Sequence, residues 1–105
     1  MFHIALHFLI PLAVSAACYR NNFWRAYLLL MSGMLIDVDH LLANPIYDPG
    51  RCSVGFHPLH TLIPVLVYVL LLIPARTRLV GIGLCIHILL DSFDCYVTNG
   101  IWMTQ

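Results

Sequence analysis

Four apolar runs, separated by short polar or Pro- and Gly-rich segments, set the pattern of this chain. The runs cover residues 2–18, 23–43, 60–73 and 79 to about 95. A run of about 15 to 20 apolar residues suits a helix that crosses a hydrocarbon core of about 30 Å. The pattern therefore predicts an all-α membrane protein, in which residues 1–105 form a single domain of four transmembrane helices packed as a bundle.

The composition supports a membrane environment. The chain is 61% hydrophobic, and its charged residues are five arginines and five aspartates, with no lysine or glutamate. A soluble helical domain of this size carries more solvated charge. We therefore expect membrane lipid, and not nucleic acid, as its partner. The aromatic residues interpreted as anchors at the membrane–water interface are Phe23, Trp24, Tyr27, Tyr96 and Trp102.

The arginines predict an orientation. Arg20 and Arg25 flank the first connecting segment, and Arg76 and Arg78 lie in the third. Because positively charged loops stay in the cytoplasm, these two segments should face inward, and the loop of residues 44–58 should face outward. The expected location is a bacterial inner membrane crossed several times, with the outer end of the bundle on the periplasmic side.

Histidine and aspartate collect at the outward end of the predicted helices. In chain order, these residues are His3, His7, Asp37, Asp39, His40, His57, His60, His87 and Asp91. Asp37 and His40 are three positions apart, and His87 and Asp91 are four apart, so each pair shares one helix face. Ionisable groups buried in a membrane are costly, and a set of this size drawn from four segments indicates a functional site.

The residue types indicate a metal site. Neutral imidazole and carboxylate are the usual zinc ligands and also suit manganese or iron. The candidate ligands are His7, Asp37, Asp39, His40, His57, His60, His87 and Asp91. This set exceeds what one tetrahedral ion needs, so we expect one or two divalent ions, zinc first among them, with two favoured. Asp39 points away from Asp37 on a helix, so at most one of these carboxylates ligates directly at a given ion.

A site with two ions predicts hydrolysis. The metals lower the pKa of a water molecule, and the resulting metal-bound hydroxide attacks a phosphate or acyl group. Asp37 or Asp39 is the nearest candidate base, and Arg51 in the outward loop is placed to hold a phosphate with two hydrogen bonds. The expected function is a membrane-embedded metal-dependent hydrolase of a lipid or envelope phosphoester. The alternative is a non-catalytic metal-binding membrane protein that acts as a carrier, a sensor or a structural subunit.

A short internal similarity suggests two related helical hairpins. Residues 6–11, LHFLIP, resemble residues 59–64, LHTLIP. His7 is followed by Asp37, and His60 is followed at nearly the same distance by Asp91, so each hairpin would provide one histidine and one aspartate. A chain this short has little room for an enclosed substrate pocket. A homodimer, or a groove that faces the lipid, is therefore the expected way to accommodate a substrate.

The cysteines predict one disulfide bond. Cys52 lies in the outward loop and Cys95 at the outward end of the fourth run, where the compartment is oxidising. We expect these two to be joined, which would hold the loop over the site. The alternative is that both are small buried apolar residues. Gly81 and Gly83 are interpreted as close-packing positions of the fourth helix.

Several motifs resemble a known family. They are Leu6-His7-Phe8 with Pro11, the segment 34–42 around Asp37-Val38-Asp39-His40, the loop 48–60, and His87 to Asp91 followed by Asp94-Cys95. Together they cover most of the chain and look like a short subfamily of the small membrane-bound proteins predicted to be metal-dependent hydrolases. That larger family is distantly similar to zinc-dependent phospholipase C. The resemblance implies a phospholipid-like phosphoester substrate and a site with more than one zinc ion.

Overall fold

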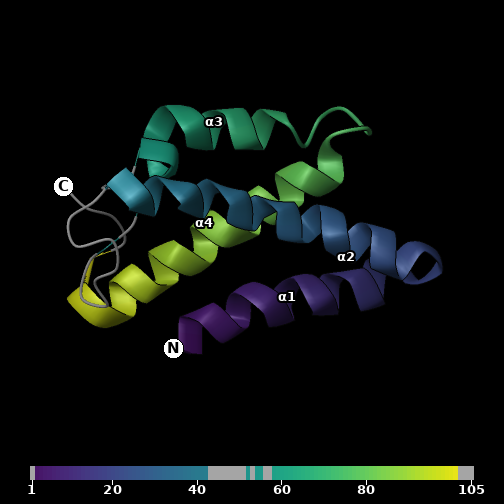
Figure 1. Cartoon of the computed structure of the whole chain (residues 1–105), viewed down its shortest axis with the longest axis horizontal. Helices are drawn as coiled ribbons and strands as arrows, with labels where there is room; N and C mark the ends of the chain where they lie inside the picture. The colour runs from purple at the N-terminus through teal and green to yellow at the C-terminus, as the bar shows by residue number, and fades with distance from the viewer. Residues whose placement is uncertain (1, 43–51, 53, 56–57, 102–105) are drawn as a thin grey trace.

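Helices form nearly all of the described structure. The computed structural model describes residues 2–42, 52, 54–55 and 58–101, without the side chains of residues 2–4 and 39–41. The α-helices are α1 (Phe2–Cys18), α2 (Phe23–Met31), α3 (Leu62–Leu70) and α4 (Arg78–Asn99) (Figure 1). The 3-10 segments are η1 (Arg20–Asn22), η2 (Ser32–Leu42) and η3 (Pro58–His60). The all-α expectation therefore holds for this part of the chain.

The prediction of four transmembrane helices is wrong. Among the described residues, only α4, with 22 residues, is long and apolar enough to cross a membrane. α2 and α3 have nine residues each, which at a rise of about 1.5 Å per residue reach about half of a hydrocarbon core of about 30 Å. α1, with 17 residues, also falls short. The apolar runs predicted helices that were too long, because the runs continue past the ends of the α-helices. The second run changes to a 3-10 helix at Ser32, and in the third run α3 already ends at Leu70.

The helices form two hairpins around α4. α1 and α2 make the first hairpin and α3 and α4 the second, and the two hairpins run in the same sense along the long axis of the molecule (Figure 1). α4 packs against each of the other three helices and against η2, whereas α1 packs on α2 and α4. α4 is therefore the element on which the rest of the fold is assembled.

Glycine lets the two hairpins approach closely. A Cβ added to Gly83 in α4 would overlap the backbone of Leu30 in α2, and one added to Gly33 would lie 2.7 Å from the backbone of Gly83. The close-packing role expected of Gly83 is confirmed, and Gly33 is its counterpart in the first hairpin. Asp37 and His87 each lie four residues beyond these glycines, so the crossing brings their side chains together.

A disulfide bond between Cys52 and Cys95 ties the segment before α3 to the end of α4. Both cysteines are buried, and their Cα atoms lie 4.8 Å apart. The predicted pairing is confirmed. Cys95 lies four residues after Asp91 and eight after His87, so the disulfide and these two side chains share one face of α4.

The buried core is small, and much apolar surface lies outside it. The core residues are Ile36, Cys52, Val54, Tyr68, Leu84, Ile88 and Cys95. Large apolar side chains on the outer faces of the helices are among the most exposed, for example Leu35 at 75%, Leu42 at 78% and Ile63 at 74%. An exposed apolar surface of this kind is typical of contact with lipid or with another protein. Together with the length of α4, it is the structural evidence for membrane association.

Candidate metal centre

Four side chains from three elements converge on one another. Asp37 comes from η2, His60 from η3, and His87 and Asp91 from α4. One nitrogen or oxygen atom from each lies within 4.8 Å of the other three. His87 and Asp91 point in the same direction because they are one helical turn apart. The centre therefore combines one rigid pair on α4 with one side chain from each of two 3-10 segments.

His60 is held in place by its neighbours in the chain. The chain turns at Gly55, whose N–H donates to the carbonyl of His60 at 3.0 Å. Gly55 has a φ of 86°, a left-handed conformation that favours glycine. The hydroxyl of Tyr68 in α3 donates to the carbonyl of Leu59 at 2.8 Å. These two bonds fix the backbone on either side of the imidazole, and the Cys52–Cys95 disulfide anchors the start of the same segment.

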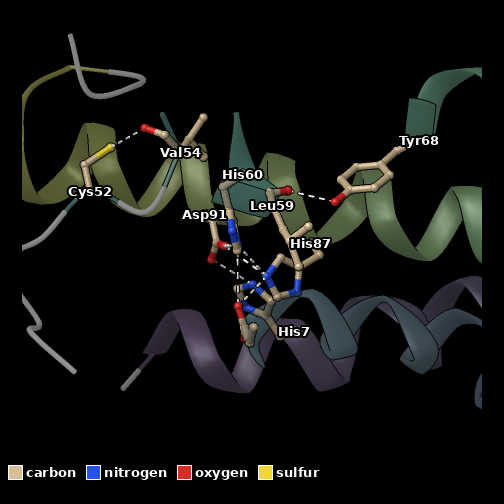
Figure 2. A network of polar contacts seen from close by, with 9 residues as sticks. His7, Cys52, Val54, Leu59, His60, Tyr68, His87 and Asp91 are labelled. Carbon is tan, nitrogen blue, oxygen red and sulfur yellow. Dashed lines mark hydrogen bonds and ion pairs between the residues drawn. The ribbon is translucent and has the colours of Figure 1, made fainter. Parts of the chain in front are cut away.

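The distances among the four groups fit a tetrahedral ion (Figure 2). The Nε2 atom of His87 lies 2.9 Å from Asp37 Oδ1 and 3.0 Å from Asp91 Oδ2. The Nε2 atom of His60 lies 3.5 Å and 3.0 Å from the same two oxygens, and the two Nε2 atoms are 3.2 Å apart. Ligands held tetrahedrally at 2.0–2.1 Å from zinc are about 3.3 Å from one another. The five measured separations are close to that value.

Hydrogen bonding alone does not account for the arrangement. A neutral imidazole carries a single N–H, yet Nε2 of His60 faces Nε2 of His87 and two carboxylate oxygens. A divalent cation would interact favourably with every lone pair in the group. Its two positive charges would also be balanced by Asp37 and Asp91, so the buried centre would carry no net charge. The four residues could therefore bind a divalent metal.

Burial differs among the four groups. His60 is 0% exposed, His87 2% and Asp91 8%, whereas the side chain of Asp37 is 36% exposed. Burial raises the pKa of the Asp37 carboxyl, but hydrogen bonds from His60 and His87 outweigh it and hold that pKa well below its usual range. Asp37 is thus ionised at neutral pH, and it is the member of the group that solvent reaches most easily.

The second ring nitrogen of His87 adds to the fit. Nδ1 is buried and has no hydrogen-bond partner among the described residues. A cavity of about 10 Å³ lies beside this ring and is also lined by His7, Pro11 and Met34. A cavity of that size is close to what one water molecule needs. An imidazole that ligates through Nε2 carries its proton on Nδ1, and such an N–H is usually given an acceptor.

His7 lies beside the four groups. Its Nε2 atom is 3.0 Å from Asp91 Oδ1, the oxygen that does not face the other ligands, and its ring meets that of His87 edge to face at 4.6 Å. If Asp91 ligates an ion, this is the position of a residue that orients the ligating carboxylate. His7 and His60, matched in the internal similarity, therefore occupy different places.

The other predicted site residues fall outside this description. Asp39 and His40 belong to η2, but the structure does not describe their side chains. Arg51 and His57 lie outside the described residues altogether. The close contact of Gly33 with Gly83, which brings Asp37 near His87, was predicted only on the Gly83 side. Gly33 lies within an apolar run, and the run by itself does not mark it as a packing position. Its spacing of four residues from Asp37, equal to that of Gly83 from His87, was the available signal.

Comparison with known proteins places the chain in a family. No curated protein and no solved structure gives a significant match. A family of unknown function, DUF6122, matches residues 1–98, which include all four residues of the centre. The chain is therefore a member of this family.

Proposed function

We propose that this protein binds a zinc-like divalent ion at the centre formed by Asp37, His60, His87 and Asp91, with the last three as ligands, and uses it to hydrolyse a phosphoester of a membrane lipid. The observation that carries the proposal is the convergence of one nitrogen or oxygen atom from each of four side chains, with five of their separations between 2.9 and 3.5 Å, in a largely buried centre. Two imidazole nitrogens and two carboxylate oxygens form a ligand set that zinc accepts, and that manganese or iron also accepts. The described residues account for one ion.

The uneven burial of the ligands supports catalysis. His60, His87 and Asp91 are the buried members of the set, and two histidines with one carboxylate form a known catalytic zinc ligand set whose fourth position is left to water or substrate. When bound, the ion would lower the pKa of a water molecule and polarise a phosphoryl oxygen. Asp37, partly exposed beside the other three groups, is the residue that would accept the proton of that water. In this role it would lie beside the ion and need not ligate it.

The surroundings of Asp37 support a lipid substrate. Its neighbours in η2, Leu35 and Val38, are 75% and 60% exposed. A carboxylate flanked by exposed apolar side chains suits a boundary where the polar headgroup of a lipid meets its acyl chains. Arg51 stays the candidate for holding the phosphate.

The disulfide supports a location for the centre. Structural disulfides persist in oxidising compartments, and the Cys52–Cys95 bond lies one helical turn from Asp91. We therefore place the centre on the outer, periplasmic face of a bacterial inner membrane.

A second function is favoured by a different feature of the same centre. Four protein ligands fill a tetrahedral shell, and a closed shell is typical of a structural or carrier site. In that case Asp37 would be a permanent ligand, and no position would remain for water. The two functions thus differ in what Asp37 does.

Metal content and hydrolysis in Asp37→Ala and His87→Ala variants test the proposal. We expect the wild type to hold about one zinc per chain and the His87→Ala variant to hold none. The Asp37→Ala variant should keep zinc with an affinity reduced by about 10- to 100-fold and should lose hydrolysis of bis(p-nitrophenyl) phosphate or of phospholipid vesicles. The control is Leu89→Ala, which shortens an exposed side chain of the same helix outside the centre and should change neither property.

Two results would contradict the proposal at different levels. A wild-type protein that takes up no zinc, manganese or iron after dialysis against each metal would exclude the metal centre. Loss of zinc from Asp37→Ala to the same extent as from His87→Ala, with no hydrolysis by the wild type, would establish the closed, non-catalytic site.

A further inference from the structure

The arginines of the described chain gather at one end of the molecule. Arg20 lies in η1 and Arg25 in the first turns of α2, while Arg76 and Arg78 lie at the connection from α3 to α4. Figure 1 shows both connections at the same end of the long axis, the right-hand end in that view. All four arginines are exposed. We call this group the arginine end.

Among the described residues, no aspartate lies at the arginine end. In the sequence, aspartates occur only at positions 37, 39, 48, 91 and 94, and the described ones among them belong to η2 and the second half of α4. None of the four arginines forms an ion pair with a carboxylate in the described part of the chain. Arg78 instead donates to the carbonyls of Leu72 and Ile73 at 2.9 and 3.1 Å. In the part of the chain that the structure describes, the cations therefore lie at a different end of the molecule from the anions.

Aromatic and apolar side chains stand beside these charges. Trp24 is 70% exposed, packs edge to face on Phe23 with ring centroids 5.0 Å apart, and precedes Arg25 in the chain. Leu28 and Ile73 are 68% and 72% exposed. Exposed tryptophan next to arginine is typical of segments at the membrane–water interface. An open hollow is lined by residues that shortly precede Trp24 in the sequence, namely Ala17, Cys18, Arg20, Asn21 and Asn22.

We propose that the arginine end binds the headgroups of anionic phospholipids. Four cations spread over two connections match a charged surface better than a single small ligand, and the adjacent apolar side chains match the acyl region beneath the headgroups. The partner is therefore an anionic lipid surface, and the hollow beside Arg20 is the place for one phosphate. This inference concerns the end of the molecule away from the ligands and does not depend on the metal centre.

Quenching of Trp24 fluorescence by brominated lipids tests the inference. The full chain carries Trp102→Phe, so that Trp24 is its only tryptophan, and is reconstituted in bilayer discs of phosphatidylcholine. Brominated phosphatidylglycerol or brominated phosphatidylcholine is then titrated at equal mole fractions. We expect half-maximal quenching at a lower mole fraction of the anionic lipid, with each arginine contributing up to about fivefold. Salt at 1 M should remove the preference, because the screening length then falls to about 3 Å.

A charge-removing variant and a charge-keeping variant complete the experiment. Replacement of all four arginines by glutamine should abolish the preference, whereas replacement of the same four by lysine should preserve most of it. Equal quenching of the wild type by both lipids at low salt would overturn the proposal, and so would a preference that persists in 1 M salt or in the glutamine variant. The salt titration uses only intact arginines, so it decides the question even if the glutamine variant does not fold.

Discussion

The two hairpins contribute unequally to the metal centre. The α3–α4 hairpin supplies His60, His87 and Asp91, all buried, and its ligand-bearing parts are joined by the Cys52–Cys95 disulfide. The α1–α2 hairpin with η2 supplies Asp37, the exposed member, and His7, which contacts Asp91 from outside the group. In the proposed site, the second hairpin would therefore hold the ion, and the first would complete and adjust the site.

The largest expected effect is loss of a ligand from the second hairpin. His60→Ala removes a fully buried imidazole with three partners in the centre and leaves Asp37 and Asp91 with less opposing charge. We expect zinc affinity to fall by more than about 100-fold, beyond what changes around the ligands cause. Isothermal titration with zinc measures it. An affinity within about tenfold of the wild type would show that the second hairpin does not hold the ion.

The next effect is removal of the disulfide. Cys52→Ser with Cys95→Ser opens a link across a sequence separation of 43 residues, for which the chain-entropy argument gives about 4 kcal/mol of unfolding free energy. Zinc affinity should fall as well, since the segment that carries His60 loses its anchor. Denaturant unfolding with and without zinc checks both effects. Cys18→Ser with Cys85→Ser, which removes the two free thiols, is the control and should leave stability close to that of the wild type.

The contact between the hairpins is tested by a pair of glycines. Gly83→Ala would place a Cβ on the backbone of Leu30, whereas Gly81→Ala would place one 3.0–3.1 Å from Leu71 within the second hairpin. The close-packing role expected of Gly81 is thus also confirmed, but its contact is looser. We expect Gly83→Ala to cost about 1–3 kcal/mol and to separate Asp37 from His87, and Gly81→Ala to cost less. Thermal unfolding and zinc titration of both variants give the comparison, which a larger effect of Gly81→Ala would reverse.

The sequence predicted the positions of the helices better than their relation to a membrane. Apolar patterning located α1 and α4 closely, because both helices occupy nearly the whole of an apolar run. It could not show that the second run changes to a 3-10 helix at Ser32, since hydrophobicity does not distinguish the two helix types. The length of an apolar run therefore does not give the length of the α-helix within it. The prediction of four transmembrane helices was wrong because it equated the two lengths.

The candidate site was predictable in its members but not in their roles. The i, i+4 spacing identified His87 and Asp91 as a pair. His60 and Asp37 were identified because the predicted topology places them at the same, outward end of the helices. His7 and His60 lie equally far from the Asp91 carboxylate but on different oxygens, and only the Nε2 atom of His60 also faces Asp37 and His87. How the helices pack decides this difference, and a sequence pattern does not show it. His7, which the pattern predicts as a ligand, lies against Asp91 Oδ1.

The smallest expected effect concerns His7 itself. His7→Ala removes the partner of Asp91 Oδ1 while leaving the four ligand atoms in place. We expect zinc affinity to fall by about 10- to 100-fold, as for other residues that orient ligands, with His7→Gln restoring part of it through a side-chain amide. A loss as large as that of His60→Ala would make His7 a ligand and the two hairpins equal partners.

The placement of two ligands on α4 has a consequence for biosynthesis. α4 follows the other three helices in the chain, so a ribosome has already made Asp37 and His60 before His87 and Asp91 exist. Until then the nascent protein offers a metal only one carboxylate and one imidazole of the centre. In the proposed site, capture of the ion and closure of the Cys52–Cys95 bond would both wait for α4, so a loaded centre would indicate that α4 has been made and has packed on the earlier elements.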